Sequence, residues 1–192
     1  FEEYDDVYRS ELEALRRLLP RPGFALEIGV GTGRFAGPLG IQVGIDPSTK
    51  MLQYARSAGI DVVRGVAEHL PFDDGTFDTA VIVTTICFVD DIPRTLSEAN
   101  RVLDTDGVLV IGYIDKHSPI GDMYREHKEE NPFYREAVFV STDELLAHLE
   151  SAGFSEFESV QTVYHWLDDI DGVEPIHGGY GDGSFVGIKA SR

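Results

Sequence analysis

The sequence predicts an α/β fold in which a doubly wound, mostly parallel sheet carries helices on both faces. Three observations predict it. Short apolar runs of strand length alternate with segments whose apolar residues have helical spacing. The first run, residues 25–28, leads into three alternating glycines, which form a tight strand-to-helix turn. The last two strand-like runs, near 155–164 and 183–190, are joined by a loop, which is typical of an antiparallel hairpin.

Seven strands are expected, one of them antiparallel to the rest. They fall near residues 25–28, 42–46, 60–64, 77–83, 108–112, 155–164 and 183–190. Helices are expected near residues 4–19, 34–39, 49–57, 92–103, 120–127 and 141–152. Pro20 stops the first helix, and Asp90 and Asp91 cap the helix that begins near 92. Ser141 and Glu144 have the spacing of a capping box.

The composition indicates a globular protein without a membrane span. Residues 1–192 form one expected domain, because no internal repeat or linker interrupts them. Hydrophobic residues make up 42% of the chain, yet no apolar run approaches the roughly 20 residues of a membrane helix. No signal peptide is visible, and Cys87 as the single cysteine permits no internal disulfide. A cytoplasmic location is therefore expected, and no membrane partner.

The net charge of −18 argues against nucleic acid as a substrate. A surface this acidic repels a phosphate backbone, but it does not exclude free small molecules. The acidic loop at 166–183 fits no known metal-binding spacing, so no metal site is expected there. The sequence leaves the oligomeric state open.

The glycine-rich turn at residues 29–33 is the strongest candidate for a ligand site. Glycine adopts positive φ angles at little cost and lets a ligand approach the backbone closely. The helix after such a turn presents free N–H groups and a partial positive charge. A ligand is therefore expected at the carboxyl end of the strand at 25–28. The alternative interpretation is a glycine-rich turn that binds nothing.

Asp46 is the second candidate, because it ends the next strand. It follows Gly29 by 17 positions (46 − 29), close to the roughly 20-residue spacing at which an acid reaches a ribose. A carboxylate accepts two hydrogen bonds from a cis-diol, so an acid suits this position. The alternative interpretation is a cap for the helix that starts near Pro47.

These motifs resemble those of class I S-adenosylmethionine (SAM) dependent methyltransferases. The first is Glu27-Ile28-Gly29-Val30-Gly31-Thr32-Gly33, an acid, one residue and three alternating glycines. The second is Gly65-Val66-Ala67-Glu68-His69-Leu70-Pro71-Phe72, which follows the third strand. The chain is similar to the small-molecule enzymes of this family, such as the ubiquinone and menaquinone biosynthesis group. The resemblance implies a Rossmann-like seven-stranded sheet, SAM as methyl donor and S-adenosylhomocysteine as product.

The resemblance also implies a set of cofactor contacts. Glu27 would organise the loop and the methionine amino group, and Asp46 would hold the ribose. The full expected set is Glu27, Gly29, Gly31, Gly33, Asp46, Pro47, Met51, Ala67, Glu68 and Thr84. Tyr4 or Tyr8, in the first helix, would help to close the site. Met51 would pack on the adenine, with plain core packing as the alternative interpretation. Thr84 would contact the ligand through its backbone or its hydroxyl.

Val66 departs from the family pattern. The family commonly has an aspartate at this position, which accepts a hydrogen bond from the adenine amino group, and valine cannot accept one. Three outcomes stay open: a backbone carbonyl or water replaces the aspartate, Glu68 takes part, or the affinity for the cofactor is weaker.

The acceptor is expected to be a small molecule that lies under a substrate-cover segment at about 113–140. In-line methyl transfer needs a base only where the nucleophile must lose a proton. The catalytic residue is not identified; Tyr113, His117 and His127 are the candidates, because they lie in or beside this segment. Two other functions compete. One is a SAM-binding regulatory or partner protein without transferase activity, and the other is an NAD-type oxidoreductase, which the glycine spacing disfavours.

Overall fold

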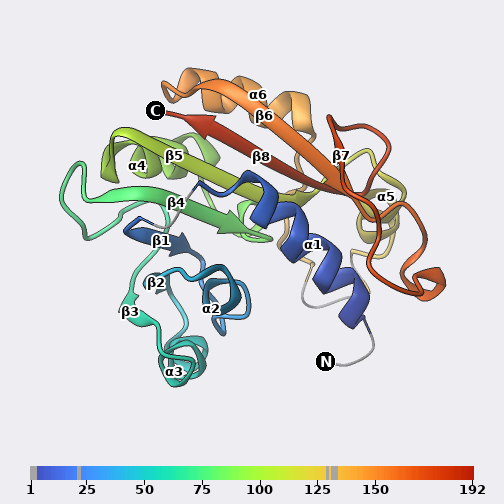
Figure 1. The fold of residues 1–192 in the computed structure, drawn as a ribbon, viewed down its shortest axis with the longest axis horizontal. Helices are drawn as coiled ribbons and strands as arrows, with labels where there is room; N and C mark the ends of the chain where they lie inside the picture. Colours follow the sequence, from blue (N-terminus) through green and yellow to red (C-terminus); the bar gives the residue numbers. More distant parts are fainter. Residues whose placement is uncertain (1–3, 21–22, 129, 131–133) are drawn as a thin grey trace.

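The structure is a computed structural model, which describes residues 4–20, 23–128, 130 and 134–192. Its centre is one sheet with the strand order β3-β2-β1-β4-β5-β8-β6-β7 (Figure 1). The strands are β1 (Ala25–Ile28), β2 (Val43–Asp46), β3 (Asp61–Arg64), β4 (Phe77–Val83), β5 (Leu103–Ile114), β6 (Ser155–Thr162), β7 (His177–Gly178) and β8 (Phe185–Ser191). Strands β1 to β5 pair in parallel.

The strand count corrects the expectation of seven strands, because the sheet has eight. The predicted antiparallel strand is β8, which pairs with β5 on one side and β6 on the other. The eighth strand, β7, lies in the segment expected to be only a loop. His177 and Gly178 pair with Gln161 and Val160 at the sheet edge. Two residues are too few to give a hydrophobic alternation, so no sequence pattern could reveal this strand.

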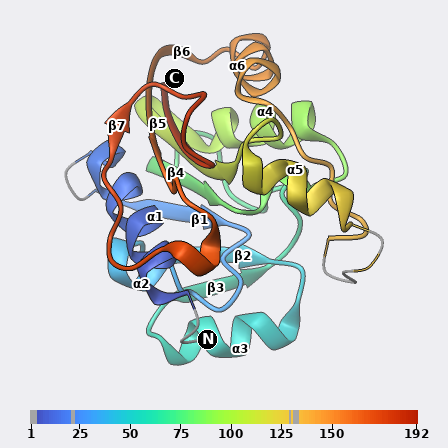
Figure 2. The same ribbon diagram turned by 90° about the vertical axis from the view of Figure 1, so that its right-hand side faces the viewer.

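Helices cover both faces of the sheet, as predicted (Figure 2). They are α1 (Asp5–Leu18), α2 (Ala36–Leu39), α3 (Thr49–Ser57), α4 (Ile92–Val102), α5 (Pro119–Glu126) and α6 (Thr142–Ser151). Successive side chains of a strand point to opposite faces. In β4, Ala80 and Ile82 pack with α4 and α6, whereas Val81 and Val83 pack with α1 and α3. No helix among the described residues is long and apolar enough to cross a membrane.

Local side chains determine where several helices begin. Asp91 is the N-cap of α4 and accepts from the N–H of Arg94 at 2.9 Å. Ser141 and Glu144 form the predicted capping box of α6. Helix α3 begins after Ser48, whose hydroxyl is its N-cap. The alternative interpretation of Asp46 as that helix cap is therefore wrong.

The topology gathers three loops at one edge of the sheet. Because β1, β2 and β4 are parallel neighbours, their carboxyl ends lie side by side. The glycine turn, Asp46 and the loop that begins at Thr84 therefore meet there. Helix α1 crosses the sheet over β5, β8 and β6, and its N-terminal half reaches this edge (Figure 1).

Candidate active site

The three glycines of the turn have different structural roles. Their φ angles are 78° at Gly29, 53° at Gly31 and 80° at Gly33, all in the left-handed region that favours glycine. A Cβ at Gly29 would overlap Thr85, and one at Gly33 would overlap Ile60. A Cβ at Gly31 would meet nothing within 4 Å. Gly31 is therefore the glycine that leaves open space above the turn.

Asp46 fixes the glycine turn to the end of β2. Its Oδ2 accepts from the N–H of Gly31 at 3.0 Å, and its Oδ1 accepts from the N–H of Ser48 at 2.8 Å. The side chain is half-buried, so it keeps a side that faces the cavity above the turn. Each carboxylate oxygen has two acceptor sites, so both can accept a further hydrogen bond.

Glu27 is a buried carboxylate that lacks a full set of partners. It is 2% exposed, and its Oε2 has no hydrogen-bond partner among the described residues. Burial raises the pKa of its carboxyl to about 8, which the backbone N–H of Ala36 partly offsets. An unpaired buried carboxyl at the wall of a cavity is costly unless a ligand supplies a donor. A cationic amino group fits this position.

A cavity of about 690 Å³ lies over the turn. All but one of the ten expected cofactor contacts line it: Glu27, Gly29, Gly31, Asp46, Pro47, Met51, Ala67, Glu68 and Thr84. The exception is Gly33, which is buried beneath the turn against Ile60. This volume suits a nucleoside-sized ligand. We call this space the nucleoside cavity.

Tyr8 and Arg34 stand at the wall of the nucleoside cavity. The Arg34 guanidinium carbon lies 4.0 Å from the centre of the Tyr8 ring, and the Tyr8 hydroxyl donates to the Arg34 carbonyl at 2.7 Å. Tyr4 does not line this cavity; its hydroxyl donates to Asp168 at 3.1 Å. Of the two tyrosines expected to close the site, Tyr8 has the position to do so. Sequence reasoning missed Arg34.

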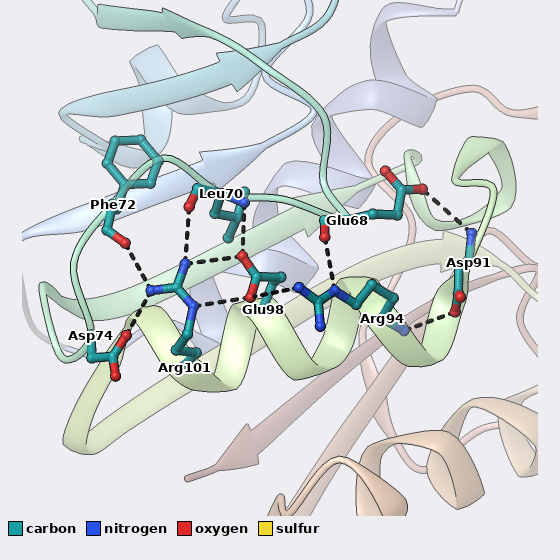
Figure 3. A network of polar contacts seen from close by, with 8 residues as sticks. All are labelled: Glu68, Leu70, Phe72, Asp74, Asp91, Arg94, Glu98 and Arg101. Atoms are coloured by element: carbon teal, nitrogen blue, oxygen red, sulfur yellow. Dashed lines mark hydrogen bonds and ion pairs between the residues drawn. The ribbon is translucent and has the colours of Figure 1, made fainter.

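The expected adenine side of the cavity is formed by residues 65–68. Val66 is 46% exposed and lines the cavity, as does Glu68. Glu68 is also structural, because its Oε1 accepts from the N–H of Asp90 at 2.8 Å. The same oxygen accepts from the N–H of Asp91 at 3.4 Å (Figure 3). This carboxylate therefore connects the 65–70 segment to the start of α4.

Behind this wall, α4 holds the 65–74 segment through an ion pair between the buried Glu98 and the partly exposed Arg101 (Figure 3). Glu98 accepts from the N–H of Leu70 at 2.8 Å and pairs with Arg101 at 2.9 Å. Arg101 also donates to the carbonyls of Leu70 and Phe72, at 2.9 and 2.8 Å. The hydrogen bond from Arg101 is the largest of the causes that lower the pKa of Glu98 to about 2. In the sequence, the signal for this ion pair was the spacing of Glu98 and Arg101, two opposite charges three residues apart on one helix.

A second cavity, of about 190 Å³, adjoins the first. We call it the acceptor cavity. Glu11, Thr84 and Phe88 line both cavities and therefore mark where they meet. Thr84 has φ 48°, a left-handed conformation that is rare for a β-branched residue and typical of strained functional sites. The rest of the wall comes mainly from the predicted substrate-cover segment: Tyr113, Ile114, Ile120, Tyr124, Tyr134, Phe139 and Val140.

The structure brings only one of the three candidate bases to a cavity. Tyr113 lines the acceptor cavity, but it is 2% exposed and its hydroxyl is bonded to the Thr142 hydroxyl at 2.6 Å. Burial raises its pKa far above the ordinary value, which makes it a poor base. His117 and His127 are exposed and line neither cavity.

Sequence reasoning missed Glu11. It lies on the buried side of α1, four residues after Val7 and four before Leu15, both of which are buried. Residues four apart share one face of a helix. A carboxylate within that apolar stripe was the signal that could have identified it.

Comparison with known proteins agrees with this geometry. A family model for a methyltransferase domain matches residues 26–111. A solved structure from Thermotoga maritima, described as a SAM-dependent methyltransferase and possible histamine N-methyltransferase, is 46% identical; the match covers 98% of this chain and 90% of that one, with a TM-score of 0.96.

Two curated relatives add to this. An uncharacterized protein of Methanocaldococcus jannaschii is 42% identical over 100% of this chain and 93% of its own length. Demethylmenaquinone methyltransferase of Staphylococcus carnosus is 30% identical over 70% of this chain and 68% of its own length. With the glycine turn, Asp46 and Glu27 arranged around one cavity, these matches give one conclusion: the chain belongs to the SAM-dependent methyltransferase family.

Proposed function

We propose that this protein transfers a methyl group from SAM to a small molecule, with SAM in the nucleoside cavity and the acceptor in the acceptor cavity. The observation that carries the proposal is the junction of the two cavities at Thr84 and Phe88. A donor and an acceptor placed on either side of this junction would meet there. Such alignment is the main requirement of an in-line transfer.

The residues present fit the donor. The unpartnered Oε2 of Glu27 suits the cationic amino group, and the half-buried Asp46 suits the ribose diol. Open space at Gly31 leaves room for the ligand against the backbone. Met51 and Ala67, which line the same cavity, suit the adenine side. When bound, SAM supplies a methyl group already activated by its sulfonium charge.

The chain itself orients the two reactants and excludes water from them. The Glu98–Arg101 pair holds Leu70, next to the wall formed by residues 65–68, and Glu68 fixes the loop that follows Phe88. Tyr8, in α1, and Arg34, just before α2, lie together at the wall of the nucleoside cavity. The substrate-cover segment, 113–140, supplies seven of the fifteen described residues that line the acceptor cavity. The solved structure described as a possible histamine N-methyltransferase and the relative named demethylmenaquinone methyltransferase support a small-molecule acceptor.

Calorimetric titration with SAM tests the donor half of the proposal. We expect one SAM per chain, and binding at least tenfold weaker in Asp46→Asn, because the variant loses the charge on the diol acceptor. Asp106→Asn, at an exposed residue of β5 that lines neither cavity, is the matched control and should bind as the wild type does. Thermal unfolding confirms that each variant is folded. No binding by the wild type at millimolar SAM would refute the proposal.

A further inference from the structure

We propose that the acceptor is a small organic amine, and that Glu11 binds its protonated nitrogen and accepts its proton. The inference rests on the proposed function and names the substrate class of its acceptor cavity. It follows from the position of one carboxylate, the chemistry of the surrounding walls and the size of the cavity.

Glu11 is a negative charge at the point where the two cavities meet. It lines both of them and is only partly buried, so a ligand in the acceptor cavity can reach it. No hydrogen bond or ion pair engages its carboxylate among the described residues. Burial raises its pKa to about 7. A carboxyl of this kind can exchange a proton with a ligand near neutral pH.

The opposing charge that acts on Glu11 is Arg34, but it forms no ion pair with the Glu11 carboxylate. The two share a surface cleft, and Arg34 lowers the pKa of Glu11 only as the smaller of two effects. The Arg34 guanidinium is instead placed over the Tyr8 ring, 4.0 Å from its centre. Glu11 therefore remains available for a cation in the acceptor cavity.

The walls of the acceptor cavity favour a cation. Five aromatic residues line it: Phe88, Tyr113, Tyr124, Tyr134 and Phe139. Tyr124 and Tyr134 stack with ring centres 4.5 Å apart, and Phe88 and Tyr134 lie 6.3 Å apart. The faces of such rings attract ammonium groups. No lysine, arginine or histidine occurs among the described residues that line the cavity, so an anionic acceptor would find no counter-charge.

The volume limits the size of the acceptor. About 190 Å³ is slightly more than the roughly 150 Å³ cavity that accommodates benzene. The cavity therefore suits a molecule of one substituted ring. An amine on a short side chain from that ring would place its nitrogen at Glu11 and its ring among the aromatic residues.

The proton transfer involves only the amine and the Glu11 carboxylate. An ammonium group enters and pairs with the ionised Glu11. One proton then moves from its nitrogen to a carboxylate oxygen, which leaves a neutral amine and a carboxylic acid. The nitrogen recovers the lone pair that methyl transfer requires, and no further reactant is needed.

The test measures binding of unreacted probes to protein saturated with S-adenosylhomocysteine. The probes are 2-phenylethylamine, 2-phenylethanol and phenylacetate, which differ chiefly in the charge of the head group. We expect the amine to bind at least tenfold more tightly than the alcohol, and phenylacetate to bind most weakly. Glu11→Gln should reduce the amine-to-alcohol preference at least tenfold while the affinity for the alcohol stays the same. Glu13→Gln, an exposed acid on the same helix, is the matched control and should retain the preference.

Three outcomes overturn the inference: the alcohol or phenylacetate binds as tightly as the amine, Glu11→Gln keeps the full preference, or none of the probes binds at millimolar concentration. These outcomes are distinguishable from failure of the proposed function. S-Adenosylhomocysteine binding is measured first, and its absence in the wild type counts against the proposed function. Binding of S-adenosylhomocysteine without an amine preference overturns the amine inference alone.

Discussion

Replacing Glu27 by glutamine should make the protein more stable and its SAM binding weaker. The carboxyl is 2% exposed, and burial raises its pKa from 4.5 to about 8. The folded state therefore binds more protons than the unfolded state between these two values. The free energy of unfolding falls as the pH rises through this interval, because ionisation is favoured only in the unfolded chain.

The magnitude follows from the pKa. Each pH unit contributes about 1.4 kcal/mol, so between pH 4.5 and pH 7 the buried acid costs about 3 kcal/mol. Glutamine has the same shape and carries no charge, so Glu27→Gln should recover up to that amount. A gain of about 3 kcal/mol corresponds to a Tm increase of roughly 6–12 °C. Urea and thermal unfolding at pH 5, 7 and 8 would measure it, and the gain should shrink at pH 5.

SAM binding should change in the opposite direction. Loss of a charged hydrogen bond to the amino group costs about 1.5–3 kcal/mol, which is roughly a 10- to 100-fold weaker affinity. At pH 7 the wild-type carboxyl is mostly protonated and should release close to one proton when SAM binds. Calorimetry in buffers of different ionisation enthalpy detects this proton, and Glu27→Gln should release none at this site. Unchanged affinity together with a less stable variant would refute the reasoning.

Three further substitutions test the wall and the turn. Glu98→Gln should destabilise the protein by about 3 kcal/mol at pH 7, because the pKa of Glu98 is held at about 2 by Arg101. The stabilisation by ionised Glu98 is present above about pH 4.5 and should be lost as the pH falls toward 2. Acid unfolding of the wild type and the variant would measure this loss. Parallel acid unfolding curves for the two proteins would contradict it. Gly31→Ala should cost about 1 kcal/mol in stability, because the φ angle of this residue is 53°. It should also weaken SAM binding at least tenfold, because the added Cβ would enter the open space above the turn. Gly29→Ala, whose Cβ would overlap Thr85, should instead disrupt the turn itself, and similar unfolding curves for the two alanine variants would be inconsistent with these roles.

The donor side of the site could be predicted because it is built locally. Glu27, the glycines and Asp46 lie at or just beyond the ends of β1 and β2, and parallel strands bring these ends together. Spacing along the chain was therefore enough to place them at one cavity. Gly33 shows the limit of that reasoning, because its backbone conformation matches the motif while its position beneath the turn follows from packing against Ile60.

The acceptor side could not be predicted because it is assembled from distant segments. Glu11 reaches the cavity only because α1 crosses the sheet over β5, β8 and β6, and spacing within the helix does not specify that crossing. His117 and His127 have suitable chemistry, yet the fold leaves both exposed and away from the cavities. Strand β7 was missed for the same reason, since its pairing with β6 depends on the hairpin partner and not on its own residues.

A crystal structure of the complex with S-adenosylhomocysteine would show where the donor lies relative to the acceptor cavity. We expect the ribose at Asp46, the amino group at Glu27 and the sulfur directed toward Thr84 and the acceptor cavity. Ligand density outside the nucleoside cavity, or a sulfur directed away from the acceptor cavity, would contradict this expectation.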